Sequence, residues 1–181
     1  MIDLDLNDRQ VDIIEDGFDL VIRIGQLPDS SLIARRLAPI HLLACASPEY
    51  LAKQGMPEQP TDLLHHQFLA YSNTNKNRKF YDDQGNSYEV SPTPSLRANN
   101  GDVLMESAIQ GHGITILPTF ILHKEIKKGR LVPVMTKYKA PSLSAYAIYP
   151  NNRFLSSKVR HMIDFLATKL EGIPYWDKDC G

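Results

Sequence analysis

The chain has 181 residues, a length that fits one domain or two small lobes. Hydrophobic residues make up 43% of it and charged residues 23%, proportions that are usual for folded globular proteins and argue against disorder. Lysine and arginine number 20 and aspartate and glutamate 21, which gives a net charge of -1. This near-balance argues against nucleic acid as a direct partner, because surfaces that bind phosphates normally carry a clear cationic excess.

Signals for membranes, export and metals are missing from the sequence. It has no apolar run of about 18 residues and no N-terminal signal pattern, which predicts a cytoplasmic protein without membrane contact. Cys45 and Cys180 lie in an apolar run and in a polar tail, so they indicate neither a disulfide nor a metal pair. The cationic stretch from Lys124 to Arg130 is interpreted as a solvated helix end rather than a binding site. We therefore predict no metal and no cofactor.

The first 25 residues show the pattern of a strand, a helix and a second strand. Apolar and polar residues alternate from Ile2 to Leu6, which predicts a strand. Asp8 is placed to cap a short helix that ends near Gly17, and a strand is expected from Phe18 to Ile24. Units of this kind build parallel sheets covered by helices, so the pattern predicts an α/β fold.

The next segment is a long extended run followed by several short elements. Leu32 to Ala46 is extended and is interrupted by Pro39, so one strand is expected to leave a first sheet and enter a second. Ser47 and Pro48 mark a helix start, with serine as the cap and proline at the first helical position. Further elements are predicted as a turn at Thr61 to Leu64, a strand at Phe68 to Tyr71 and a hairpin at Lys79 to Val90.

Two helices in the second half follow directly on strands. Leu96 to Ala98 leads into Asn99–Asp102, and apolar residues at helical spacing resume at Val103. A buried strand, Gly113 to Leu117, is followed by Pro118, which opens the next helix. The remaining elements are predicted as strands at Leu131 to Met135 and Leu143 to Tyr149, and a helix capped by Ser156.

This order of elements predicts two α/β lobes joined by two crossover strands. The first subdomain is expected to comprise residues 1–40 and 143–181, and the second residues 41–142. Open α/β sheets bind ligands outside the carboxyl ends of their strands. A ligand cleft is therefore expected between the lobes.

An ordered series of motifs extends over nearly the whole chain. It consists of Asn7-Asp8-Arg9 through Arg23-Ile24-Gly25, Leu27 to Leu37, Cys45 to Leu51, Asn99 to Asp102, Gly111 to Pro118, Gly129 to Val134, and Tyr149-Pro150. The series resembles the C-terminal effector-binding, or substrate-binding, domain of LysR-type transcriptional regulators. The resemblance implies a two-lobed fold like that of periplasmic binding proteins, a small-molecule inducer, and a parent protein that forms a homodimer or tetramer.

The sequence departs from this family at its start. Members open with a winged helix-turn-helix, a linker helix, and a first strand and helix, and nothing of this kind precedes Asp3. The resemblance therefore implies an N-terminally truncated domain whose first lobe is incomplete. It also implies that DNA is contacted only through a helix-turn-helix that this sequence lacks.

Eight residues are predicted to bind a small polar or anionic effector: Asn7, Arg23, Gly25, Asn99, Asn100, Gly101, Pro118 and Thr119. Asn99 to Gly101 precede a helix whose free N–H groups suit an anion. Several of these residues also have a structural alternative. Asn7 and Thr119 can cap helices, Arg23 can pair with an aspartate, and the asparagines can form a turn capped by Asp102.

Three classes of function are considered. The ordered motifs favour the sensor domain of a transcription regulator. A free-standing solute-binding protein of a transporter would share the architecture, but it would require a signal peptide. An enzyme is not predicted, because the sequence has no G-x-S-x-G, H-E-x-x-H or phosphate-binding glycine motif.

Overall fold

The computed structural model of the protein describes residues 2–7, 13, 15–25, 32–150 and 156–178. The chain divides into two units, which we describe separately. The first comprises Met1–Ala38 and Ser144–Gly172, and the second Pro39–Leu143 and Ile173–Gly181. The segment Ile173–Gly181 thus belongs with the second unit, whereas the sequence prediction placed it in the first subdomain. No helix in the described part of the chain is long and apolar enough to cross a membrane.

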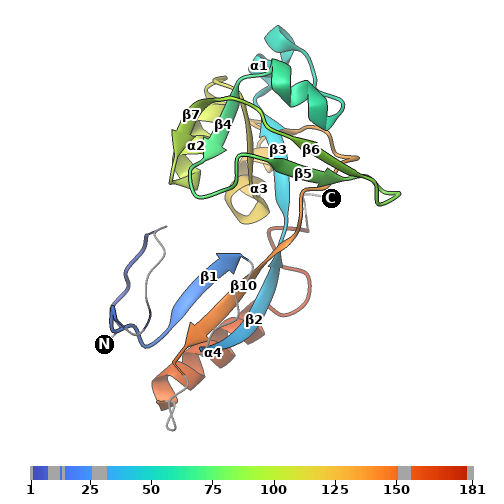
Figure 1. The fold of residues 1–181 in the computed structure, drawn as a ribbon. Helices are drawn as coiled ribbons and strands as arrows, with labels where there is room; N and C mark the ends of the chain where they lie inside the picture. Colours follow the sequence, from blue (N-terminus) through green and yellow to red (C-terminus); the bar gives the residue numbers. More distant parts are fainter. Residues whose placement is uncertain (1, 8–12, 14, 26–31, 151–155, 179–181) are drawn as a thin grey trace. The chain divides into compact units, whose positions relative to one another are not determined.

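The first unit contains a three-stranded sheet and one helix. The strand order is β1 (Val21–Gly25), β10 (Leu143–Tyr149) and β2 (Ile33–Ile40). Helix α4 (Ser157–Lys169) is adjacent to this sheet (Figure 1) and begins where the Ser156 hydroxyl accepts a hydrogen bond from Val159 N at 3.3 Å. The predicted cap and the predicted strand at Leu143–Tyr149 are therefore confirmed.

The prediction of a strand at Ile2 to Leu6 is wrong. These residues form no strand, and the side chains of Ile2, Leu4 and Leu6 are 69%, 72% and 87% exposed. Alternation alone does not make a strand, because the backbone also needs a neighbouring strand to supply hydrogen bonds. The parallel pair predicted between this strand and the next is therefore absent, and β1 pairs instead with β10, antiparallel. Most of the helix predicted between Asp8 and Gly17 lies outside the described residues.

The second unit is built on a five-stranded sheet in the order β7-β4-β8-β3-β9. These strands are β3 (Leu42–Ala46), β4 (Phe68–Tyr71), β7 (Pro94–Ala98), β8 (Ile114–Pro118) and β9 (Val132–Pro133). β4 runs parallel to both β7 and β8, and β3 runs antiparallel to β8. The predicted extended run from Leu32 to Ala46 is present as β2 and β3, with a break at His41 rather than at Pro39.

Helices and a hairpin cover the two faces of this sheet. One face packs on α2 (Gly101–Ile109) and α3 (Thr119–Lys127), with Cys45, Leu69 and Leu117 in the shared core. The other face packs on α1 (Pro48–Gln54), the 3₁₀ helix η1 (Pro60–His65) and the hairpin β5 (Arg78–Tyr81) and β6 (Ser87–Val90). The predictions of this hairpin and of Ser47 as the cap of α1 are confirmed.

Candidate functional site

The carboxyl edge of the five-stranded sheet carries two helix starts. Because β7 and β8 both run parallel to β4, the segments that follow them emerge at the same edge. α2 starts after β7 and α3 after β8. A Cβ atom at Gly101 would lie 2.6 Å from Ile121 Cδ1, so glycine lets the first turn of α2 approach α3 closely. The first N–H groups of a helix have no acceptor within it, so this edge suits an anion.

Asn100 caps α2. Its side-chain oxygen accepts a hydrogen bond from Val103 N at 3.1 Å, and its backbone is extended. The sequence analysis gave Asp102 as an alternative cap of this helix, but Asp102 lies inside the first turn of α2. Asn99 and Asn100 are both exposed and Gly101 is buried. The predicted contact of these residues with an effector stays a prediction.

Thr119 is buried and bonded within the chain. Its hydroxyl donates to Asp177 Oδ1 at 2.6 Å, and its backbone N–H donates to His41 O at 2.9 Å. The other oxygen of Asp177 lies 3.0 Å from His41 Nδ1. Trp176 packs edge-on against Phe120, with ring centroids 6.0 Å apart. The Asp177 carboxylate therefore already lies at the start of α3. No local sequence pattern indicates the contact between Thr119 and Asp177, because the two positions are far apart in the chain.

The other predicted effector residues are distributed over both units. Asn7 donates from Nδ2 to Asp5 Oδ1 at 2.7 Å and does not end a strand. Arg23 lies in β1 opposite Tyr146, half-buried, and forms no ion pair with any described residue, and Gly25 ends the same strand. Pro118 ends β8 in the second unit, directly before Thr119. The structure thus brings together Asn99, Asn100, Gly101, Pro118 and Thr119 at one edge.

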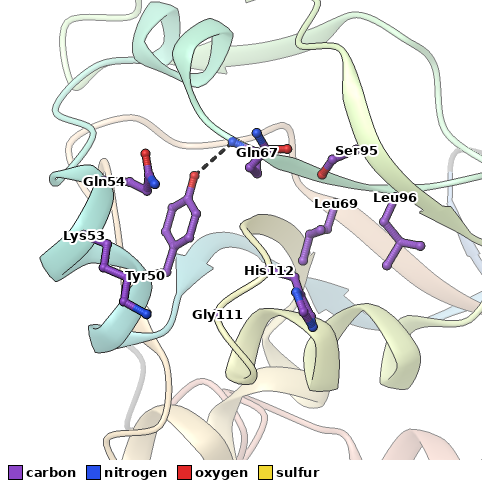
Figure 2. A pocket seen from close by; sticks show the side chains of 9 residues that line it. All are labelled: Tyr50, Lys53, Gln54, Gln67, Leu69, Ser95, Leu96, Gly111 and His112. Atoms are coloured by element: carbon purple, nitrogen blue, oxygen red, sulfur yellow. Dashed lines mark hydrogen bonds between the residues drawn. The ribbon is translucent and has the colours of Figure 1, made fainter.

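A second feature, missed by the sequence analysis, is a cavity of about 540 Å³ toward the amino ends of the parallel strands (Figure 2). It is lined by Tyr50, Lys53, Gln54, Gln67, Leu69, Ser95, Leu96, Gly111 and His112. Tyr50 Oη accepts a hydrogen bond from Gln67 N at 2.9 Å and lies 3.0 Å from His66 Nδ1. Burial raises the pKa of Tyr50, which favours its neutral hydroxyl.

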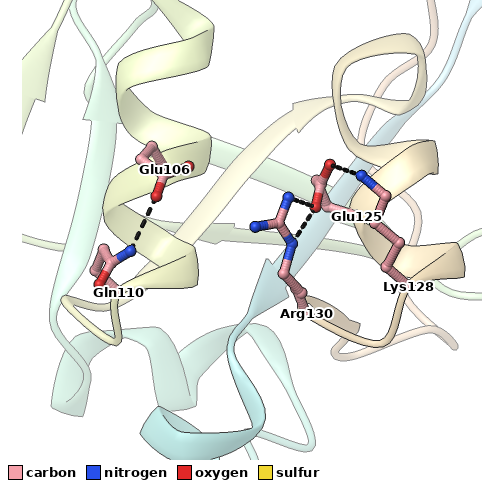
Figure 3. Close-up of polar contacts among 5 residues, drawn as sticks. All are labelled: Glu106, Gln110, Glu125, Lys128 and Arg130. Carbon is pink, nitrogen blue, oxygen red and sulfur yellow. Dashed lines mark hydrogen bonds and ion pairs between the residues drawn. The ribbon is translucent and has the colours of Figure 1, made fainter.

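At the end of α3, two cations of the stretch from Lys124 to Arg130 contact one buried carboxylate (Figure 3). Glu125 forms ion pairs with Lys128, at 3.2 Å, and with Arg130. Burial alone would raise the pKa of Glu125, but the hydrogen bonds and charges of Lys128 and Arg130 lower it overall. These contacts fasten the end of α3 to the loop that leads into β9.

Replacing Glu125 with glutamine should destabilise the protein by about 1–2 kcal/mol, since it leaves two cations without their partner. A carboxyl group with a lowered pKa stabilises the fold fully above its ordinary pKa of 4.5, and this contribution falls as the pH drops below that value. The difference between wild type and variant in urea unfolding should therefore shrink at low pH. Glu106→Gln is the control, because within the described part of the chain the exposed Glu106 carboxylate accepts a hydrogen bond only from Gln110 Nε2, at 2.9 Å. An equal loss of stability in Glu125→Gln and Glu106→Gln would show that the ion pairs of Glu125 do not stabilise the fold.

Comparison with known proteins identifies the class of this fold. Full-length AphB, a virulence activator of Vibrio cholerae and a member of the LTTR protein family, matches with a TM-score of 0.82 and 27% identity over 93% of this chain and 57% of that chain. The regulatory domain of CrgA, a LysR-type transcriptional regulator from Neisseria meningitidis, matches with a TM-score of 0.76 and 32% identity over 87% of this chain and 78% of that chain. The fold is thus the α/β, periplasmic-binding-protein-like fold of regulatory domains.

The family follows from the sequence matches. The family model described as the LysR substrate binding domain matches residues 2–171, and the chain belongs to that family. An HTH-type transcriptional regulator of Haemophilus influenzae is 36% identical over 159 residues, which cover 87% of this chain and 55% of that protein. The chain spans about half the length of the curated relatives it matches. The family is one of transcription regulators, so the sensor-domain prediction is confirmed over the transport alternative.

Proposed function

We propose that this chain senses a small polar or anionic effector at the carboxyl edge of its five-stranded sheet. The observation that supports this most directly is the start of α2 at that edge, with Asn99, Asn100 and Gly101. Pro118 and Thr119 lie at the neighbouring start of α3, where the Thr119 hydroxyl already donates to Asp177. Asn7, Arg23 and Gly25 of the first unit stay effector contacts that we propose from the sequence alone.

The proposal extends to the protein of which this domain forms part. That protein regulates transcription in the cytoplasm as a homodimer or tetramer. It contacts DNA through a helix-turn-helix, the module for which relatives are named HTH-type regulators. This domain itself carries out no catalysis, and effector binding changes how the regulator acts.

Asn100→Asp tests the proposal. An aspartate retains an oxygen that accepts from Val103 N, so the fold should melt nearly unchanged, while the added negative charge repels an anion. In a thermal-shift screen of small carboxylic acids at constant ionic strength, a compound that stabilises the wild type should lose most of its effect in this variant. Asn100→Ala should cost about 1 kcal/mol even without ligand, because it removes the cap.

Ser47→Ala is the matched control, since it removes a helix cap elsewhere in the second unit. It should lower the melting temperature but leave the shift caused by the compound intact. A compound whose effect survives in Asn100→Asp would place the effector elsewhere.

A further inference from the structure

Two arginines lie at one face of the five-stranded sheet, Arg97 on the sheet and Arg78 on the hairpin that covers it. Ala70 of β4 is in register with Arg97 of β7, so their side chains point to the same side. Leu69 packs on the opposite side, in the core shared with α2. Arg97 therefore lies on the face that the β5–β6 hairpin covers. Arg78 begins β5, two residues before the core residue Phe80, and so points toward the same face.

Arg78 is held against an aromatic ring. Its guanidinium carbon lies 5.3 Å from the centroid of Phe68, at the start of β4. Its Nε atom is buried and has no hydrogen-bond partner. A buried donor without an acceptor costs free energy, and an arriving anion can recover that cost.

Neither arginine has an acidic partner among the described residues. Other cations are neutralised: Arg35 pairs with Asp164, Arg130 with Glu125 and Lys139 with Asp83. Glu89, the carboxylate of β6, instead accepts a hydrogen bond from Asn77 Nδ2 at 2.6 Å. Burial and the positive charge of Arg97 both lower the pKa of Arg78. Arg97 is exposed, and its positive charge acts on the half-buried Arg78 without a described acidic partner for either.

We propose that Arg78 and Arg97 bind an anionic group, a phosphate or a carboxylate, between the hairpin and the edge strand β7. Guanidinium groups bind both kinds of oxyanion through paired hydrogen bonds, and two of them match a group with more than one negative charge. The site lies on the sheet face opposite α2, whose first residues carry the proposed effector contacts. It is therefore independent of the proposed function.

Calorimetric titration of the whole chain with inorganic phosphate, and separately with malonate, tests the site at constant ionic strength. Binding should be at least about tenfold weaker in Arg78→Gln and in Arg97→Gln, because each loses a charge-assisted contact. Lys79→Gln is the matched control, since Lys79 is the next cation on β5 and also lies over an aromatic ring, at 5.2 Å from Tyr81. It should bind the anion as the wild type does.

Each possible result decides the question. Binding of phosphate alone identifies a phosphate ligand, binding of malonate alone a carboxylate ligand, and binding of both the shared anion chemistry. Binding of neither, or equal weakening in Lys79→Gln, overturns the site. Without anion, Arg97→Gln should melt no lower than the wild type, because it removes repulsion, and this readout shows that the variant is folded. Asn100→Asp should bind the anion normally, which separates this site from the effector site.

Discussion

Replacing Gly113 with alanine is expected to destabilise the protein by about 3 kcal/mol or more. Gly113 has φ +150, a conformation that side chains rarely adopt, and an added Cβ would lie 2.4 Å from the carbonyl oxygen of Gln67. That oxygen accepts a hydrogen bond from Ile114 N at 2.9 Å, so the backbone cannot withdraw without opening the start of β8. Urea unfolding followed by circular dichroism measures the loss.

Gly85→Ala is the matched control for this strain. Gly85 also has positive φ, +85, but a Cβ there would meet nothing within 4 Å. The loss should therefore be only about 1 kcal/mol, the cost of the backbone conformation itself. Equal losses in the two variants would show that the contact with Gln67 is not what requires glycine at position 113.

Amide hydrogen exchange should differ by at least about 10³-fold between residues 2–7 and residues 114–117. The first segment is exposed and forms no strand. β8, in contrast, is paired with β4 on one side and β3 on the other, and Ile114, Thr115 and Leu117 are almost fully buried. Exchange measured by mass spectrometry on peptides covering each segment gives the comparison. Equal protection of both segments in a proven monomer would mean that residues 2–7 are also hydrogen-bonded in solution.

Local signals predicted much of the fold, because the interactions behind them are local. Ser47 and Ser156 each accept a hydrogen bond from an N–H three residues ahead, so the pattern and its cause lie within one helical turn. The hairpin between Arg78 and Val90 is closed by a turn in which Asp82 accepts hydrogen bonds from Gln84 and Asn86. In each case the residue types themselves determine the geometry.

The features that the sequence did not predict depend on distant partners. Alternation at Ile2 to Leu6 shows which residues are apolar but not whether another strand lies alongside. The choice of Asn100 over Asp102 as the cap depends on where β7 stops. The pairing of Thr119 with Asp177 joins positions 58 residues apart, and only the folded chain brings them together. The same holds for Arg78 and Arg97, because only the packing of the hairpin on the sheet brings them to a common face.

The bond from Thr119 to Asp177 also has a consequence for how the protein is made. Synthesis runs from the N-terminus, so Asp177 leaves the ribosome only after β10 and α4, which belong to the other unit. Until then, His41 and Thr119 lack their hydrogen-bond partner Asp177. Phe120 of α3 likewise lacks the ring contact with Trp176. The second unit is therefore completed after the last helix of the first has been synthesised, although most of its own residues were made earlier.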